Sequence, residues 1–187
     1  MTLEVLRAED RPATPWLNGG GVTREIAVRP AAAPMTDFDW RISLADVAGG
    51  GPFSVFPDVD RVITLVDGAG MALTVDGAER VLDRPFQPFA FPGDATTDCR
   101  LLAGPVVDFN VMTRRGRATA RVDTTDTVLP VEPVDGTTVL VVCLSGTATL
   151  DAAGLHLDRF DAAVLPTGPD LVRADGTTAV VTIRHTA

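Results

Sequence analysis

The stretch Thr64-Leu65-Val66-Asp67-Gly68-Ala69-Gly70-Met71-Ala72-Leu73 returns in altered form as Val142-Cys143-Leu144-Ser145-Gly146-Thr147-Ala148-Thr149-Leu150. Each copy predicts a strand, a glycine turn and a second strand, because β-prone residues flank the glycines. Two further blocks recur in the same order: Leu82-Asp83-Arg84 as Leu157-Asp158-Arg159, and Phe91-Pro92-Gly93 as Leu165-Pro166-Thr167-Gly168. The copies lie roughly 75 residues apart, which exceeds solenoid periods and indicates a duplicated unit.

The whole chain has the pattern of an all-β protein. Short β-branched runs alternate with Gly, Pro, Asp and Thr, whereas helical periodicity is scarce, as expected for an antiparallel sandwich or barrel. The predicted strands are Val22–Val28, Trp40–Ala45, Val62–Val66, Met71–Val75, Glu79–Leu82, Phe89–Phe91, Cys99–Leu102, Asp108–Thr113, Ala118–Val122, Thr138–Leu144, Thr147–Leu150, Leu155–Leu157, Ala162–Leu165 and Ala179–Arg184.

The order of hairpin, Leu-Asp-Arg, Pro-x-Gly turn and closing strand resembles the cupin family, whose fold is a small antiparallel jelly-roll barrel. The resemblance implies a bicupin: a first barrel over residues 1–123, a linker over 124–136 and a second barrel over 137–187, in which the two barrels can share N-terminal strands. Metal-dependent cupins carry a His-x-His motif, a Glu and a further His. Here His156 and His185 are isolated and the first half has no histidine, so we expect no metal.

Composition limits the chemistry and the partners. The net charge of −9 argues against general attraction to nucleic acid or anionic membranes. All 16 basic side chains are Arg, which excludes mechanisms that need a lysine amine, a pyridoxal linkage among them, and we expect no cofactor. Cys99 and Cys143 form neither a metal spacing nor a disulfide framework. With a charged N-terminus and no apolar run of membrane length, the expected location is cytoplasmic.

The segment Trp16-Leu17-Asn18-Gly19-Gly20-Gly21 precedes a β-prone run and has two interpretations. Glycine permits positive φ and close backbone approach, and successive N–H groups can form a small anion-binding concavity. A plain N-terminal turn is the alternative, and this segment alone favours it.

Polar side chains in three predicted strands are candidates for a binding site. Along Asp37–Val47, Arg41 and Ser43 alternate with Trp40; such a polar face usually meets solvent, but in a small barrel it lines a ligand cavity. Arg61 begins an apolar strand, and a guanidinium there would bind a carboxylate or pair with one of the 25 acidic residues. The predicted ligand-binding residues are Asn18, Thr23, Arg41, Ser43, Arg61 and Asn110, with apolar walls from Trp16, Trp40, Phe53 and Phe56.

Several blocks taken in order resemble the HutD/Ves family, most strongly over residues 1–117. They are Trp16-Leu17-Asn18-Gly19-Gly20-Gly21-Val22-Thr23-Arg24-Glu25-Ile26, Asp37-Phe38-Asp39-Trp40-Arg41-Ile42-Ser43, Gly51-Pro52-Phe53-Ser54-Val55-Phe56-Pro57, Phe91-Pro92-Gly93-Asp94 and Asp108-Phe109-Asn110-Val111-Met112-Thr113-Arg114. The resemblance implies a bicupin with an accessory or regulatory role in histidine utilisation, whose ligand is a small carboxylate such as urocanate or formylglutamate. The family's common Trp-Lys-Asn reads Trp16-Leu17-Asn18 here, so that positive charge is missing.

Three functions stay open at this point. The favoured one is a metal-free, non-catalytic protein that binds a small anionic metabolite, as a monomer or a homodimer. The second is a cupin enzyme that uses a carboxylate pair, such as Glu25 with Asp94 or Asp108, for proton transfer; Cys143 as a nucleophile is weaker, since it lies in an apolar strand. The third is a protein-interaction module without a ligand.

Overall fold

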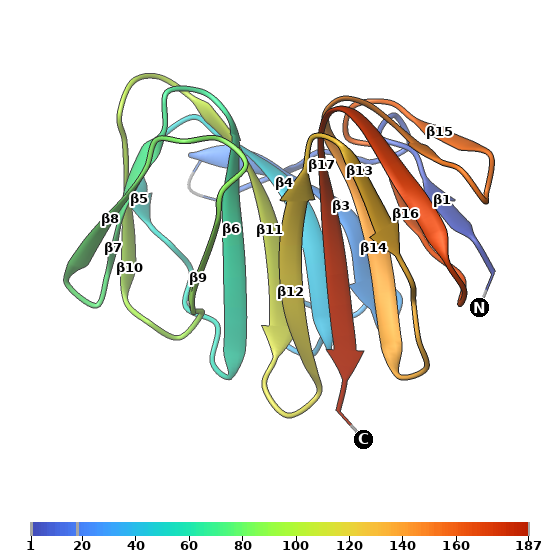
Figure 1. Ribbon diagram of the computed structural model, residues 1–187. Coiled ribbons are helices and arrows are strands. Elements are labelled where there is room, and N and C mark those ends of the chain that lie inside the picture. The colour runs from blue at the N-terminus through green and yellow to red at the C-terminus, as the bar shows by residue number, and fades with distance from the viewer. Residues whose placement is uncertain (1, 18, 187) are drawn as a thin grey trace. The chain divides into compact units, whose positions relative to one another are not determined.

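The computed structural model describes residues 2–17 and 19–186, which form seventeen β-strands and no helix (Figure 1). All strand neighbours are antiparallel, as the alternation of β-prone runs and turn residues predicts. By their contacts the strands form two compact units, one from Pro12 to Arg117 and one that joins residues 2–11 to residues 118–186. No helix in the described ranges is long and apolar enough to cross a membrane.

The unit from Pro12 to Arg117 contains two sheets. The first has the order β2-β3-β4-β11-β6-β9 and the second the order β5-β10-β7-β8. Its strands are β2 (Thr14–Pro15), β3 (Gly21–Arg29), β4 (Trp40–Val47), β5 (Gly51–Pro52), β6 (Val59–Asp67), β7 (Met71–Val75), β8 (Ala78–Leu82), β9 (Pro88–Pro92), β10 (Thr97–Leu101) and β11 (Val106–Arg114). Alternate residues of both sheets, such as Ile63, Leu65 and Leu73, pack into one apolar core.

The other unit is built on a seven-stranded sheet (Figure 1). Five of its strands follow the order β1-β16-β14-β17-β12; of the other two, β13 pairs with β17 and β15 pairs with β14. Its strands are β1 (Glu4–Leu6), β12 (Ala118–Thr125), β13 (Val128–Val131), β14 (Thr137–Leu150), β15 (Leu155–Leu157), β16 (Ala162–Val164) and β17 (Asp170–His185). The long strands β14 and β17 pair along almost their whole length. A core of apolar side chains, Val141, Leu150 and Leu157 among them, fills the unit.

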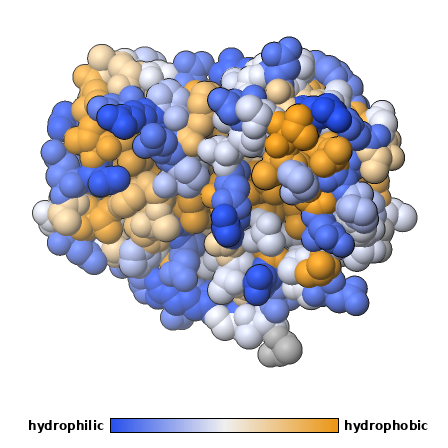
Figure 2. Space-filling view, in the orientation of Figure 1, coloured by the Kyte–Doolittle hydropathy of each residue, from blue (hydrophilic) through white to orange (hydrophobic). Residues whose placement is uncertain are grey.

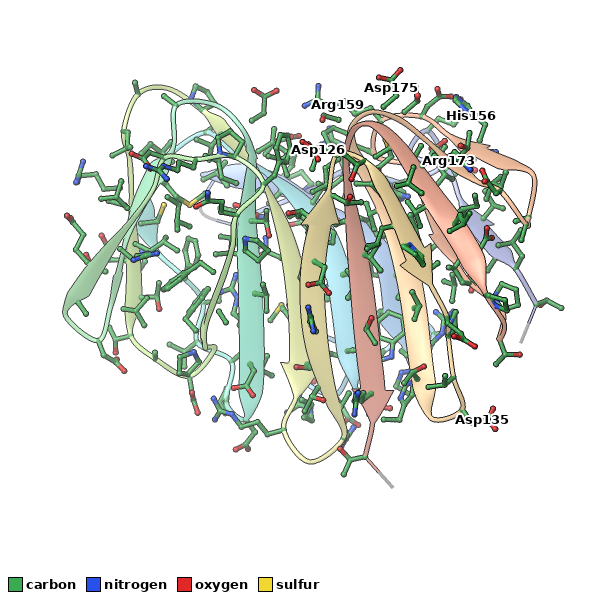
Figure 3. The ribbon with its side chains drawn as sticks, viewed as in Figure 1. Asp126, Asp135, His156, Arg159, Arg173 and Asp175 are labelled. Carbon is green, nitrogen blue, oxygen red and sulfur yellow. The ribbon has the colours of Figure 1, made fainter. Side chains whose placement is uncertain are left out.

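Most charged side chains of this second unit lie on its outside, with Asp161, 5% exposed, as an exception. Figure 3 labels six that are exposed at its edges: Asp126, Asp135, His156, Arg159, Arg173 and Asp175. On the molecular face that Figure 2 shows, hydrophobic and hydrophilic residues are mixed.

Residues 2–11 are tied to the rest of the second unit by an ion pair whose carboxylate is buried and whose guanidinium is 37% exposed. Strand β1 pairs with β16, and the carboxylate of Asp161 accepts hydrogen bonds from the Arg7 guanidinium (2.6 Å) and from the Ala8 amide (2.8 Å). Burial opposes ionisation of Asp161, yet these bonds hold its pKa below the usual value. Contacts between residues 4–8 and residues 161–164 therefore make the N-terminal segment part of this unit.

Replacing Asp161 by Asn is expected to loosen this segment. The variant removes the charge that Arg7 and Ala8 bind, at a cost of about 1–3 kcal/mol in the free energy of unfolding. Trypsin cleavage after Arg7 should become faster, as measured by mass spectrometry of a time course; the bond after Arg11 precedes Pro12 and resists trypsin. Asp158→Asn is the matched control, since its exposed side chain lies 3.4 Å from His156 and accepts no hydrogen bond from the described N-terminal residues 2–11. Equal cleavage of both variants would contradict the anchoring role.

The expected strands are all present, but one expected turn is wrong. Thr64–Leu73 folds as predicted, since β6 and β7 flank a turn at Gly68 and Gly70. In the second copy no turn forms: β14 runs unbroken through Gly146, with a register shift between Cys143 and Ser145. Four short strands, β1, β2, β5 and β13, were not predicted, and β13 lies inside the expected linker over 124–136.

Candidate functional site

A cavity of about 540 Å³ opens in the unit from Pro12 to Arg117. Five strands of the larger sheet contribute to its lining, namely β2, β3, β4, β6 and β11, and the segments around Trp16, Met35 and Phe53 complete it. The lining residues are Thr14, Pro15, Trp16, Leu17, Thr23, Met35, Arg41, Ser43, Ala45, Pro52, Phe53, Ser54, Phe56, Arg61, Asp108, Asn110 and Met112.

Strand alternation explains which side chains face the cavity. On β4 the residues Arg41, Ser43 and Ala45 line it, and on β11 Asp108, Asn110 and Met112 do so. The register brings them together, since Asn110 pairs with Ser43 and Met112 pairs with Arg41.

Arg61 is the central charged group of the cavity. Its guanidinium lies 5.0 Å from the ring centroids of both Phe53 and Phe91 and 5.7 Å from that of Phe56. Its Nη2 donates to Oδ1 of Asn110 at 3.0 Å, whereas its buried Nε has no hydrogen-bond partner within the described part of the chain. Burial lowers the pKa of Arg61 to about 10, an effect that the charge of Asp108 partly offsets.

Asp108 continues this chain of polar groups. Nδ2 of Asn110 donates to its Oδ1, so that Asn110 bridges Arg61 and Asp108. The carboxyl is 2% exposed, and burial raises its pKa to about 7. Arg61 and the Asn110 hydrogen bond lower that value, and the neighbouring charge of Asp46 raises it. Asp108 therefore changes charge near neutral pH.

The glycine segment forms a turn at the cavity mouth. The Gly19 amide donates to the carbonyl of Trp16 at 3.0 Å, and the Trp16 amide donates to the carbonyl of Gly21 at 2.9 Å. A Cβ on Gly21 would lie 2.4 Å from the Asp46 carbonyl and 3.2 Å from the Trp16 ring, so close approach requires glycine there. The turn interpretation accounts for these contacts, and Trp16 is held by a 2.7 Å bond from its Nε1 to Oγ1 of Thr23.

Eight of the ten predicted ligand-binding residues line this one cavity: Trp16, Thr23, Arg41, Ser43, Phe53, Phe56, Arg61 and Asn110. Trp40 does not line this cavity: it lies on the opposite face of β4, 1% exposed, with Arg29 5.4 Å from its ring. Asn18 lies outside the described residues. Asp108 was missed as a ligand-facing residue, although strand phase already placed it beside Asn110.

The proposed acid–base pairs do not assemble. Glu25 pairs with Arg41 at 3.0 Å and Asp94 with Arg115 at 2.7 Å, and neither carboxylate lines the cavity. Burial raises the pKa of the Cys143 thiol to about 11, so it stays protonated and is a poor nucleophile. Across residues 2–17 and 19–186, no three His, Cys, Asp or Glu side chains gather as a metal site.

Arg114 and Arg117, in the basic segment at the end of β11, bond to other parts of the fold. Arg114 donates to the carbonyls of Phe38 and Thr36, and Arg117 pairs with Asp37 and Asp39. These bonds tie the end of β11 to the loop before β4.

A second concavity of about 590 Å³ lies in the other unit, lined by Pro130, Val131, Glu132, Asp151, Ala152, Pro169, Asp170 and Leu171. Two of its three acidic groups have partners: Asp151 pairs with Arg173, and Asp170 accepts from the amides of Ala152 and Leu171. With no basic side chain in its lining, this concavity does not suit an anion.

Comparison with known proteins places the chain in one family. The family model described as HutD matches residues 8–182. An uncharacterised 21.2 kDa protein in the hutC 3′ region of Pseudomonas putida is 38% identical over 157 residues, which cover 84% of this chain and 82% of that protein. Protein Ves of Cronobacter sakazakii is 42% identical over 125 residues, 66% of this chain and 67% of its own length.

Solved structures agree with this assignment. HutD from Pseudomonas fluorescens SBW25, in a formate condition, superposes over 100% of both chains with a TM-score of 0.89 and 36% identity. A cupin 2 conserved barrel domain protein from Leptotrichia buccalis has a TM-score of 0.57 and 12% identity over 88% of each chain, a likeness of fold alone. The protein is therefore all-β and cupin-like, and it belongs to the HutD family.

Proposed function

We propose that the cavity over Arg61 binds a small carboxylate, and that the protein thereby acts as an accessory or regulatory component of histidine utilisation. The observation that carries the proposal is the buried Arg61 with one N–H, Nε, unpartnered at a cavity. An unsatisfied buried donor costs about 1–3 kcal/mol, and more when it is charged. A carboxylate in the cavity would accept from this group and offset the burial of the cation.

The remaining lining fits an acid with a short apolar body. Ser43 and Thr23 supply hydroxyl groups, while Phe53 and Phe56 form apolar walls. At the mouth, Leu17 and Met35 are exposed, as is Val55 beside the lining residue Ser54. A volume of about 540 Å³ falls in the range of small-molecule sites.

The Pseudomonas putida relative supports the same pathway, and the solved Pseudomonas fluorescens structure suggests formate as a first probe. The Pseudomonas putida protein is named for the hutC 3′ region, and the Pseudomonas fluorescens HutD structure was obtained in a formate condition. Formate is the smallest carboxylate, and urocanate and formylglutamate are the pathway acids we propose as candidates. We also propose a cytoplasmic bicupin, which the duplicated sequence order and the cupin-like fold support.

A thermal-unfolding scan with formate, urocanate, formylglutamate, glutamate and histidine tests the proposal. A ligand at a hundred times its Kd adds ~2.7 kcal/mol to the free energy of unfolding. The expected midpoint shift is roughly 5–10 °C for a chain of this size. At least one carboxylate should produce it.

Arg61→Met should abolish the shift, because the replacement keeps volume but removes charge and donors. Arg100→Met is the matched control, since Arg100 is exposed, pairs with Glu79 at 3.4 Å and lies outside the cavity lining. The proposal fails if no carboxylate shifts the midpoint, or if the shift persists in Arg61→Met. Either result would favour the third function, a module that binds a protein partner.

A second candidate, proton-transfer catalysis, is favoured by one observation: the pKa of about 7 for Asp108, which suits a general acid or base at neutral pH. Turnover of a panel acid by the purified protein, lost in Asp108→Asn while binding persists, would support it. Recovery of every acid unchanged would exclude it for this panel.

A further inference from the structure

The Arg61, Asn110 and Asp108 side chains form one buried polar chain that ends at two separate places in the cavity. Among the described residues no ion pair joins Arg61 to Asp108; Asn110 lies between them and contacts both. Asp108 lines the cavity but is only 2% exposed. Water therefore screens little of the electrostatic interaction between its carboxylate and a bound ligand. A carboxylate bound at Arg61 would place a second negative charge in the same enclosed space.

We propose that the cavity takes up one proton on Asp108 together with its carboxylate ligand, which makes ligand affinity depend on pH across the neutral range. The inference rests on the proposed function, and it adds Asp108 as a residue that controls the affinity for the carboxylate. Two like charges that share a site with little water do not both stay ionised, because one of them gains a proton. The proton comes from solvent, and no covalent bond changes.

The groups around Asp108 favour this exchange. On β6, Arg61 is the cation that stabilises the ionised carboxyl, and an anionic ligand would neutralise it. On β4, Asp46 adds a like charge that raises the pKa of Asp108, while Arg41 of the same strand is paired with Glu25. On β10, burial raises the pKa of the Cys99 thiol to about 11, so Cys99 is neutral. In the empty cavity the pKa of Asp108 is about 7, and a second anion moves it upward.

Formate is the probe for the test, because it carries no other titrating group in this range. Its Kd is measured by isothermal calorimetry and by the fluorescence of Trp16 at several values between pH 6 and 8.5. Arg61 keeps its proton throughout, since its pKa is about 10. For uptake of one proton the Kd should rise roughly thirtyfold across this range. At pH 8 the heat of binding should change with the ionisation enthalpy of the buffer, in proportion to the protons bound.

Two variants separate this role from a merely structural one. Asp108→Asn should show a Kd independent of pH, and no buffer-dependent heat. Asp46→Asn removes a like charge, lowers the pKa of Asp108 and should move the bend of the pH profile to lower pH, which gives a second reading if Asp108→Asn folds poorly. Formate binding to the natural protein with a constant Kd would overturn this inference alone. No binding of any carboxylate at any pH would overturn the proposed function, and this inference with it.

Discussion

Gly146→Ala is expected to cause the largest loss of stability of any single methyl addition considered for the second unit. Gly146 pairs with Gly176 where β14 and β17 change register, and its φ is +66°. A Cβ there would lie 1.8 Å from the carbonyl oxygen of Asp175, a separation that only backbone displacement relieves. Left-handed φ costs about 1–2 kcal/mol for alanine. Overpacking adds about 1–3 kcal/mol more, so the expected total is roughly 2–5 kcal/mol.

Gly154→Ala is the matched control for the steric part of this loss. Gly154 has φ +59°, and a Cβ built on it meets no atom within 4 Å. Both variants therefore carry the same backbone strain, and only Gly146→Ala carries the collision. Urea unfolding followed by far-UV circular dichroism gives both free energies; tryptophan fluorescence does not, since Trp16 and Trp40 belong to the other unit. Equal losses would show that the strands move apart there at little cost.

Gly146 also shows what the sequence could and could not predict about the fold. Alternating β-prone runs and glycine-rich connections were enough to predict the all-β class, and every range predicted as a strand lies within or overlaps an observed strand. They did not distinguish a turn between two sheets at Gly68 from a bend within one strand at Gly146, because both need positive φ. What decides is the partner strand: β17 runs alongside β14 through the bend and keeps it paired. Strands of two or three residues, such as β2 and β1, carry too little pattern to be seen.

The cavity was partly predictable for a similar reason. Strand phase placed Arg41 with Ser43 and Asp108 with Asn110, and the structure keeps both groupings. Phase did not show that Trp40 faces away from the cavity, since both faces of β4 are largely buried. The packing of Phe91 against Arg61 and the raised pKa of Asp108 depend on contacts between strands far apart in sequence, which no local pattern contains.

Replacing both buried charges, as in Arg61→Met with Asp108→Asn, is expected to stabilise the empty protein and to abolish carboxylate binding. Exchange of buried opposite charges for uncharged groups of similar volume is often neutral or stabilising by about 1–4 kcal/mol. The unpartnered Nε of Arg61 adds to the cost that the variant removes. Binding should be lost because no cation remains in the cavity floor; Arg41, at the cavity wall, is already paired with Glu25.

The stabilisation should depend on pH in a defined direction. The folded-state pKa of Asp108, about 7, lies above its ordinary value of 3.8, so folding retains a proton that the unfolded chain releases. Stability of the natural protein therefore falls as pH rises through this window, and the full cost is present above about pH 7. The pKa of Arg61, about 10, lies below 12.5, so the cost of its charge is present at every pH below about 10.

Urea unfolding at pH 5.5 and at pH 8 measures both parts of this expectation. The double variant should exceed the natural protein in free energy of unfolding at both values, and by a larger margin at pH 8, where Asp108 is ionised. Arg61→Met alone should gain less, because it leaves Asp108 without the cation that lowers its pKa. If the double variant is less stable at pH 8, then the Arg61, Asn110 and Asp108 chain holds the fold together, and its charges are not a stability cost that ligand binding offsets. A gain at pH 8 together with lost binding would mean that these two charges are kept for the ligand.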